Sequence, residues 1–152
     1  MTYARVAGTT FTAFLVSQIC AIAVHGFILA GDYAHYYGTL LRDQRGGPEW
    51  QAIVLPVAHL SLVSGLVWIY ARVSLEGSRA VQGLKLGVVA WVVGEAPNWL
   101  RWYSEQPWPG ELVVKQLGLT LLSSLAIGLT IALVARQPDR RTVRAMPAGT
   151  GA

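Results

Sequence analysis

Charged residues are scarce in this chain of 152 residues, and cysteine occurs only once. Asp, Glu, Lys and Arg make up 13% of the residues and hydrophobic residues 53%, whereas a soluble domain carries about a quarter charged residues. This shortage argues against a freely soluble enzyme, a disordered regulator and a nucleic-acid-binding module. The single cysteine, Cys20, excludes an internal disulfide framework and any cysteine-rich metal site.

The sequence does contain long stretches without charge. Residues 6–31, 50–71 and 116–135 form runs of 26, 22 and 20 positions with no acidic or basic side chain. About 20 apolar residues are enough for a helix to cross a bilayer core of about 30 Å. The runs are continuously apolar, which favours helices over the alternating strands of a membrane barrel. The chain is therefore expected to cross a membrane as helices.

A fourth span is less clean, because Lys85 and Glu95 interrupt it, but its centre LGVVAWVVG is strongly apolar. We predict an all-α fold, an integral membrane four-helix bundle of up-down topology. The first span is longer than the 7–15 apolar residues of a signal peptide, so we expect it to be retained as a helix. The predicted transmembrane domain is residues 1–136, with spans at about 7–31, 50–72, 80–103 and 112–135.

Basic residues are distributed unevenly between the two ends of these spans. On the side that holds both termini, eight basic residues stand against two acidic ones, and on the other side four stand against six. Because basic residues collect on the cytoplasmic side, we expect a multi-pass protein of the cytoplasmic (inner) membrane with both termini cytoplasmic. Residues 137–152 are predicted to form a disordered basic tail near anionic lipid headgroups.

Three ionisable side chains fall inside the predicted spans. Counted from the outer ends of their helices at 1.5 Å per residue, His25 lies roughly 9 Å deep, His59 roughly 13 Å and Glu95 roughly 12 Å. Ionisable groups within a membrane are costly and usually face a partner inside the bundle. We therefore predict a candidate pocket in the outer leaflet. Its predicted residues are His25, His59, Glu95, Asn98, Arg101, Lys115, Trp99 and Trp102.

Aromatic residues gather at the same outer boundary. Interfacial anchoring accounts for most of them. Trp99 and Trp102, however, stand beside the polar residues Asn98 and Arg101, so they could also line the pocket or a partner surface.

Several uses of the cluster remain open. His25 and His59 could ligate a b-type haem, although no cofactor is predicted outright. Glu95 and the histidines could form a proton or ion path, or act as acid and base on a lipid-like substrate. Alternatively, the histidines hydrogen-bond across helices and Glu95 pairs with Arg101 or Lys115 as structural glue. No metal site is predicted, because the third histidine is expected outside the membrane.

Small residues recur at helical spacing and are expected to bring helices into close contact. Gly83 and Gly87 have the GxxxG spacing of close helix pairs. The residues predicted to pack helices together are Ser17, Ala21, Gly83, Gly87, Gly94, Ser124 and Gly128.

Three segments, FILAGDYAHYYG, SLEGSRAVQGLKLG and NWLRWY, resemble a broad group of small bacterial four-span membrane proteins of unknown function. The matching residues of this chain are Leu29, Ala30, Asp32, Tyr33, Glu76, Gly77, Gly83 and Gly87. The resemblance covers most of residues 10–135 and implies a topology but no activity.

No motif decides a chemistry, since Walker, HExxH, CxxC and GxSxG patterns are all missing. We therefore expect an accessory subunit that lies in the lipid bilayer and packs against other membrane subunits or a second copy. The alternative is an outer-leaflet binding protein or enzyme for a lipid, quinone, pigment or haem.

Overall fold

The computed structural model describes residues 1–36 and 51–135, and every regular element in this part of the chain is a helix. The predicted basic tail and most of the first outer loop lie outside the described residues. In chain order the elements are α1 (Tyr3–Ala21), η1 (Ile22–Ile28), α2 (Ala30–Ala34), α3 (Gln51–Arg72), α4 (Arg79–Ala90), η2 (Trp91–Glu95), α5 (Ala96–Glu105) and α6 (Gly110–Ala135).

Within the described residues, three helices are long and apolar enough to cross a membrane. They span Tyr3–Ile28, Ile53–Arg72 and Gly110–Ala135, and they correspond to the three charge-free runs of the sequence. The segment of α4, η2 and α5 is also helical but carries Lys85 and Glu95, and it is not one of the three.

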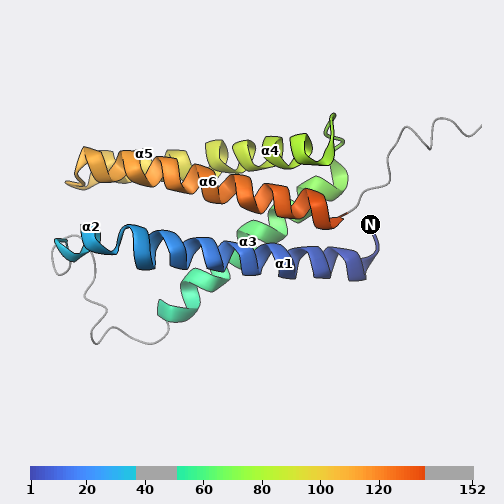
Figure 1. Ribbon diagram of the computed structural model, residues 1–152, viewed down its shortest axis with the longest axis horizontal. Helices are drawn as coiled ribbons and strands as arrows, with labels where there is room; N and C mark the ends of the chain where they lie inside the picture. The colour runs from blue at the N-terminus through green and yellow to red at the C-terminus, as the bar shows by residue number, and fades with distance from the viewer. Residues whose placement is uncertain (37–50, 136–152) are drawn as a thin grey trace, which may run out of the picture.

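Most of the helices run along the long axis of the molecule. In Figure 1, α1 and α6 extend side by side, α4 and α5 lie on the other side of α6, and α3 crosses them obliquely. The most extensive packing is between α4 and α6, followed by α1 with α6 and α1 with α3. The N-terminus and the end of α6 lie at the same end of the molecule, here called the terminal end; the opposite end is the loop end.

A tight turn at the terminal end starts α4. Gly77 has a φ of 108°, a left-handed conformation that glycine adopts without steric cost. The Oγ of Ser78 then accepts a hydrogen bond from the backbone N–H of Val81 at 3.4 Å and caps the helix. Lys85 extends back to this turn and donates to the carbonyl of Glu76 at 3.1 Å. The charge of Lys85 thus lies toward the helix end, as expected for a snorkelling lysine.

Glycines allow α4 and α6 to touch through their backbones. A Cβ atom on Gly87 would lie 2.6 Å from the carbonyl oxygen of Ser124, and one on Gly83 would lie 2.7 Å from the Cα of Leu129. A Cβ on Gly128 would collide with the carbonyl of Gly83 in the same way. Small residues at these positions permit the close approach that stabilises helix pairs in membranes.

The core is divided into two apolar clusters. The terminal-side cluster joins all four long helices, and the loop-side cluster joins η1, α2 and the start of α6 with the turn before it. Both clusters belong to the described residues. The terminal-side cluster consists of Ala13, Val63, Leu66, Val67, Tyr70, Leu86, Ala90, Ile127, Ile131, Ala132 and Ala135. The loop-side cluster consists of Val24, Leu29, Tyr33, Trp108, Leu112 and Val113.

Candidate functional site

Two π-helical segments interrupt the α-helices. In η1 the backbone N–H of Leu29 donates to the carbonyl of Val24 at 2.9 Å, and in η2 the N–H of Ala96 donates to the carbonyl of Trp91. Pro97 gives a physical reason for η2, because it has no N–H to donate to the carbonyl four residues earlier and its ring crowds that carbonyl. π-Helical turns are rare and frequently occur at functional sites.

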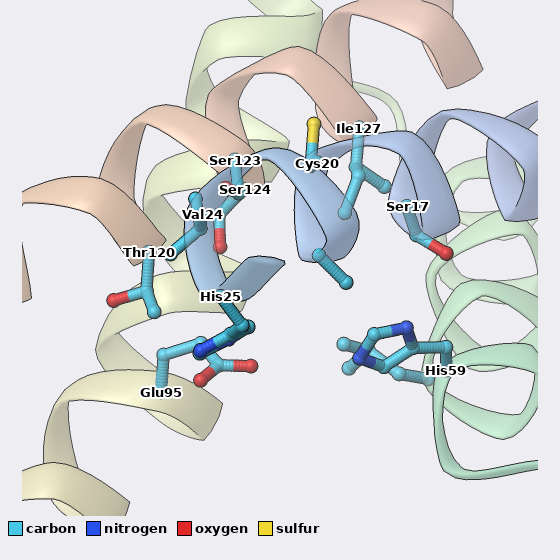
Figure 2. A pocket seen from close by; sticks show the side chains of 12 residues that line it. Ser17, Cys20, Val24, His25, His59, Glu95, Thr120, Ser123, Ser124 and Ile127 are labelled. Atoms are coloured by element: carbon cyan, nitrogen blue, oxygen red, sulfur yellow. The ribbon is translucent and has the colours of Figure 1, made fainter. Parts of the chain in front are cut away.

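Each π-helical segment carries one of the ionisable residues picked out from the sequence, His25 in η1 and Glu95 in η2. Figure 2 shows these two side chains and His59 of α3 turned toward the same space from three different elements. All three line one cavity of about 90 Å³, here called the central pocket. The complete lining is Ser17, Cys20, Ala21, Val24, His25, His59, Leu62, Glu95, Thr120, Ser123, Ser124 and Ile127.

The central pocket lies where the two apolar clusters meet. Val24 belongs to the loop-side cluster and Ile127 to the terminal-side cluster, and both contribute to its wall. The sulfur of Cys20 points away from the histidines and Glu95 in Figure 2. The pocket is therefore a polar site between two apolar clusters, and it opens to the surface at His25, which is exposed.

The two histidines are held by different partners. Nδ1 of His59 lies 2.9 Å from Nε2 of Gln18, which joins α3 to α1. Nδ1 of His25 lies 2.8 Å from the hydroxyl of Tyr33, and the same hydroxyl accepts a hydrogen bond from Nε2 of Gln116. An amide nitrogen can only donate, so Nδ1 of His59 is an acceptor and the proton of the neutral ring lies on Nε2.

Glu95 has no hydrogen bond or ion pair to any side chain of the described residues. The expected pairing with Arg101 or Lys115 is wrong, because both cations have other partners. Arg101 contacts Glu105 at 3.6 Å, and Lys115 contacts Asp32 at 3.1 Å and Glu111 at 3.2 Å. Glu105 and Glu111 lie one helical turn from their cations, and Asp32 comes from α2; the side chains of these pairs are partly exposed on the loop-end surface.

The rest of the predicted pocket lies elsewhere. Asn98 accepts a hydrogen bond from Arg101 at 3.3 Å on the surface of α5. Trp99 is buried and packs edge-to-face on Trp102 and Trp108, with ring centroids 5.1 and 6.2 Å apart. Five of the predicted pocket residues are therefore not part of the lining, since they pair with other side chains or pack nearer the loop end: Asn98, Arg101, Lys115, Trp99 and Trp102.

The hydroxyl groups of the pocket were not predicted as its lining. Ser17 donates to the carbonyl of Phe14 at 2.7 Å, Thr120 to that of Gln116 at 2.8 Å and Ser123 to that of Leu119 at 3.0 Å. Each hydroxyl proton is thus used within its own helix. The Thr120 oxygen also accepts from the indole N–H of Trp91 at 3.2 Å, and a hydroxyl oxygen has two lone pairs with which it can accept. The spacing of Gln116, Thr120 and Ser123 on one face of α6 is the signal that sequence reasoning missed.

The residues predicted to pack helices divide into two groups. Most of them lie inside the bundle: Ser17, Ala21 and Ser124 line the pocket, and Gly83, Gly87 and Gly128 form the α4–α6 contact. Gly94 is different: it is exposed, and a Cβ added to it would have no neighbour within 4 Å among the described residues. Its expected role in helix packing is wrong, because the π-helical turn at η2 carries it to the outer surface.

The size and ligands of the pocket argue against a large cofactor. Cofactor and drug-sized ligands occupy sites of about 300–1,000 Å³, whereas the central pocket measures about 90 Å³. A haem between His25 and His59 does not fit this space. No group of three metal-ligating side chains occurs in the described residues, and the exposed His35 is not part of the lining.

No family model, curated protein or solved structure matches this chain. The likeness to small bacterial four-span proteins therefore stays a resemblance of sequence pattern. The function has to be argued from the central pocket itself.

Proposed function

We propose that the chain is an integral membrane protein in which α1–η1, α3, α4–η2–α5 and α6 form a four-helix up-down bundle. Its outer faces support this, since large apolar side chains are exposed on them, among them Phe27 (77%), Val93 (74%) and Ile19 (65%). In water such a surface would aggregate, whereas in lipid it is solvated. The sided distribution of basic residues supports cytoplasmic termini and an inner-membrane location.

We further propose that the central pocket binds a proton or another small monovalent cation, with Glu95 as its main ligand. The observation that carries this proposal is the half-buried carboxyl group of Glu95, which has no counter-charge among the described residues. A lone carboxylate in apolar surroundings is strongly disfavoured, so it takes up a proton or holds a cation. His25 and His59 share the pocket and offer two further proton-binding sites.

The volume of the pocket selects among ligands. A cavity of about 90 Å³ has room for a few water molecules or for a small cation with part of its hydration shell. The acceptor oxygens of Ser17, Thr120 and Ser123 suit such an occupant. A quinone, a pigment, a lipid headgroup or a haem would each need a larger cavity.

A carbodiimide experiment tests this proposal. Dicyclohexylcarbodiimide is apolar and reacts with protonated carboxyl groups, so we expect it to label Glu95 in the purified protein in lipid vesicles. Mass spectrometry would locate one adduct, absent in Glu95→Gln and retained in the surface control Glu111→Gln. Protection by sodium at constant pH, with choline as the replacement ion, would identify a metal cation; protection by raised pH alone would identify the proton. A folded wild-type protein without the Glu95 adduct would overturn the proposal.

A role as an accessory subunit is the second candidate, and the exposed face around η2 favours it. Val92 and Val93 are 53% and 74% exposed, and a Cβ added to Gly94 would have no neighbour within 4 Å in the described part of the chain, so another membrane helix could cover this face. The mass of the protein after gentle detergent extraction from its native membrane tests this role. A larger complex of constant composition supports it, and a monomer that binds its cation alone contradicts it.

A further inference from the structure

We infer that Tyr33 and Gln116 form a proton relay that connects the central pocket with the loop end of the molecule. The inference rests on the proposed function, because it assigns the route by which a proton reaches Glu95. It starts from Tyr33 and Gln116, two side chains that lie next to His25 but do not line the pocket.

The relay is a continuous chain of polar atoms. Gln116 donates through Nε2 to the hydroxyl of Tyr33, and that hydroxyl lies 2.8 Å from Nδ1 of His25. The side chains are deeply placed, since Gln116 is fully buried and Tyr33 is 8% exposed. His25 is the junction, because its ring also lines the central pocket.

The relay assigns a direction to the phenolic proton. The amide nitrogen of Gln116 donates to the Tyr33 oxygen, and in the relay the phenolic O–H donates to Nδ1 of His25. The proton of the neutral His25 ring then lies on Nε2. An imidazole held in this way can take up a proton at one nitrogen and release another at the opposite nitrogen.

An unpaired oxygen gives the relay a place for water. Oε1 of Gln116 is fully buried, and no donor of the described residues lies within hydrogen-bond distance of it. Buried acceptors of this kind are generally satisfied by protein or by ordered water. A water molecule bound to Oε1 lies next to the Tyr33 hydroxyl, because Oε1 and Nε2 belong to the same amide group.

The relay lies on the loop-end side of the central pocket. The residues that precede Tyr33 and Gln116 in sequence, Asp32 and Lys115, form an ion pair on the loop-end surface with side chains 34% and 42% exposed. On the opposite side of the pocket, Ala13, Val63 and Ile131 are fully buried in the terminal-side cluster. The polar atoms of the relay therefore lie on the loop-end side of the pocket, away from the terminal-side cluster.

The transfer balances in protons. Tyr33 gives its hydroxyl proton to Nδ1 of His25, and Nε2 of His25 releases its proton into the pocket, where Glu95 accepts it. The water at Gln116 returns a proton to the Tyr33 oxygen and is itself reprotonated from the loop end. Other titratable groups at the pocket are His59 from α3 and Cys20 from α1, while α6 contributes none.

The rate of hydrogen–deuterium exchange at Glu95 tests the relay. The full-length protein in lipid vesicles is mixed with D₂O at a pH where Glu95 is protonated. The shift of its carboxyl C=O band, isolated by subtraction of the Glu95→Gln spectrum, is then followed by infrared spectroscopy. We expect Tyr33→Phe and Gln116→Met each to slow this exchange at least about tenfold; a positioned proton-transfer group contributes typically about 10²–10⁴-fold. Carbodiimide labelling of Glu95 at equilibrium stays within about twofold of wild type, since the pocket itself is intact.

Matched variants separate the relay from the pocket and from the fold. Tyr103→Phe removes an exposed phenol hydroxyl from the same end of the molecule and should exchange like wild type. If Tyr33→Phe does not fold, Gln116→Met decides alone. Exchange at the wild-type rate in whichever of the two variants folds, with Glu95 still labelled, overturns the relay and leaves the proposed function standing. Loss of Glu95 labelling in the wild type overturns the proposed function itself.

Discussion

The hydroxyl of Tyr33 lies 2.8 Å from Nδ1 of His25, and the two rings stack with centroids 5.8 Å apart and planes 12° apart. In a regular α-helix, residues eight positions apart are separated by about 12 Å along the axis and about 80° around it. The contact is possible because η1 is π-helical and the chain leaves helical geometry at Leu29 (φ −99°, ψ 1°) before α2. The break in the helix thus places the phenol beside the imidazole.

Tyr33→Phe should destabilise the protein more than Asp32→Asn, although the two positions are adjacent. Loss of the Tyr33 hydroxyl leaves the amide of the fully buried Gln116 and Nδ1 of His25 without this partner, which costs about 1–3 kcal/mol. Asp32→Asn breaks a partly exposed pair, and Lys115 keeps Glu111 at 3.2 Å, so we expect a loss below about 1 kcal/mol. Denaturant titration in mixed micelles, monitored by circular dichroism, measures both; an equal or reversed order would contradict the buried hydrogen bond.

Gln18 and His59 should be energetically coupled across α1 and α3. Their side chains lie 2.9 Å apart and are half-buried. Hydrogen bonds between membrane helices contribute about 0.6 kcal/mol on average and up to about 1.7 kcal/mol. A double-mutant cycle with Gln18→Ala and His59→Ala should therefore give a coupling of about 0.5–1.5 kcal/mol. Gln18→Ala combined with the distant Lys85→Ala is the control pair, and a coupling no larger than that of the control would refute the contact.

Glu95→Gln should not lower the stability of the folded protein. The carboxyl group has no counter-charge among the described residues, so the neutral amide of similar shape loses no ion pair and avoids the cost of an isolated charge. Glu105→Gln, which removes the exposed partner of Arg101, is the surface control and should change the free energy of unfolding by less than about 0.5 kcal/mol. A decrease above about 1 kcal/mol in Glu95→Gln, on the scale of a lost buried hydrogen bond, would reveal a partner of the carboxylate.

The helical fold could be predicted from the sequence because its signal is local. Charge-free runs mark α1–η1, α3 and α6, and the GxxxG spacing of Gly83 and Gly87 marks the face of α4 that meets α6. Gly94 follows Gly87 by seven residues, which in a regular α-helix is the same face, but it lies inside η2, where the backbone is not α-helical. The assumption of a constant rotation per residue therefore placed it on the wrong face.

Of the predicted pocket residues, only His25, His59 and Glu95 line the central pocket. Counting residues inward from the ends of helices correctly indicated that His25, His59 and Glu95 lie close enough to share one pocket. The same counting attached Arg101 and Lys115 to it, because sequence depth does not show that a long side chain prefers a nearby carboxylate at the surface. Tyr33 was missed for the opposite reason, since its contact with His25 depends on the irregular backbone between them.

Substitution of Gly128 should disrupt the contact between α4 and α6. A Cβ atom there would meet the backbone of both Gly83 and Gly87, and backbone atoms cannot move aside as a flexible side chain can. We expect Gly128→Val to lower the free energy of unfolding by about 3 kcal/mol or more, at or beyond the upper end of what overpacking costs in a close-packed interior. Gly118→Ala is the matched control on the same helix, because nothing of the described structure lies within 4 Å of its added Cβ.

The control should even gain stability, by about 0.5–1 kcal/mol, since alanine loses less backbone entropy than glycine when a helix forms. Gly94→Ala, in η2, should likewise be tolerated, because its added Cβ also points into open space. Denaturant titrations of the three variants beside the wild type measure the order. A Gly128→Val protein as stable as Gly118→Ala would mean that α4 and α6 do not touch through their glycines. The arrangement of the central pocket would then also be wrong, because its lining from η2 and α6 depends on this close contact.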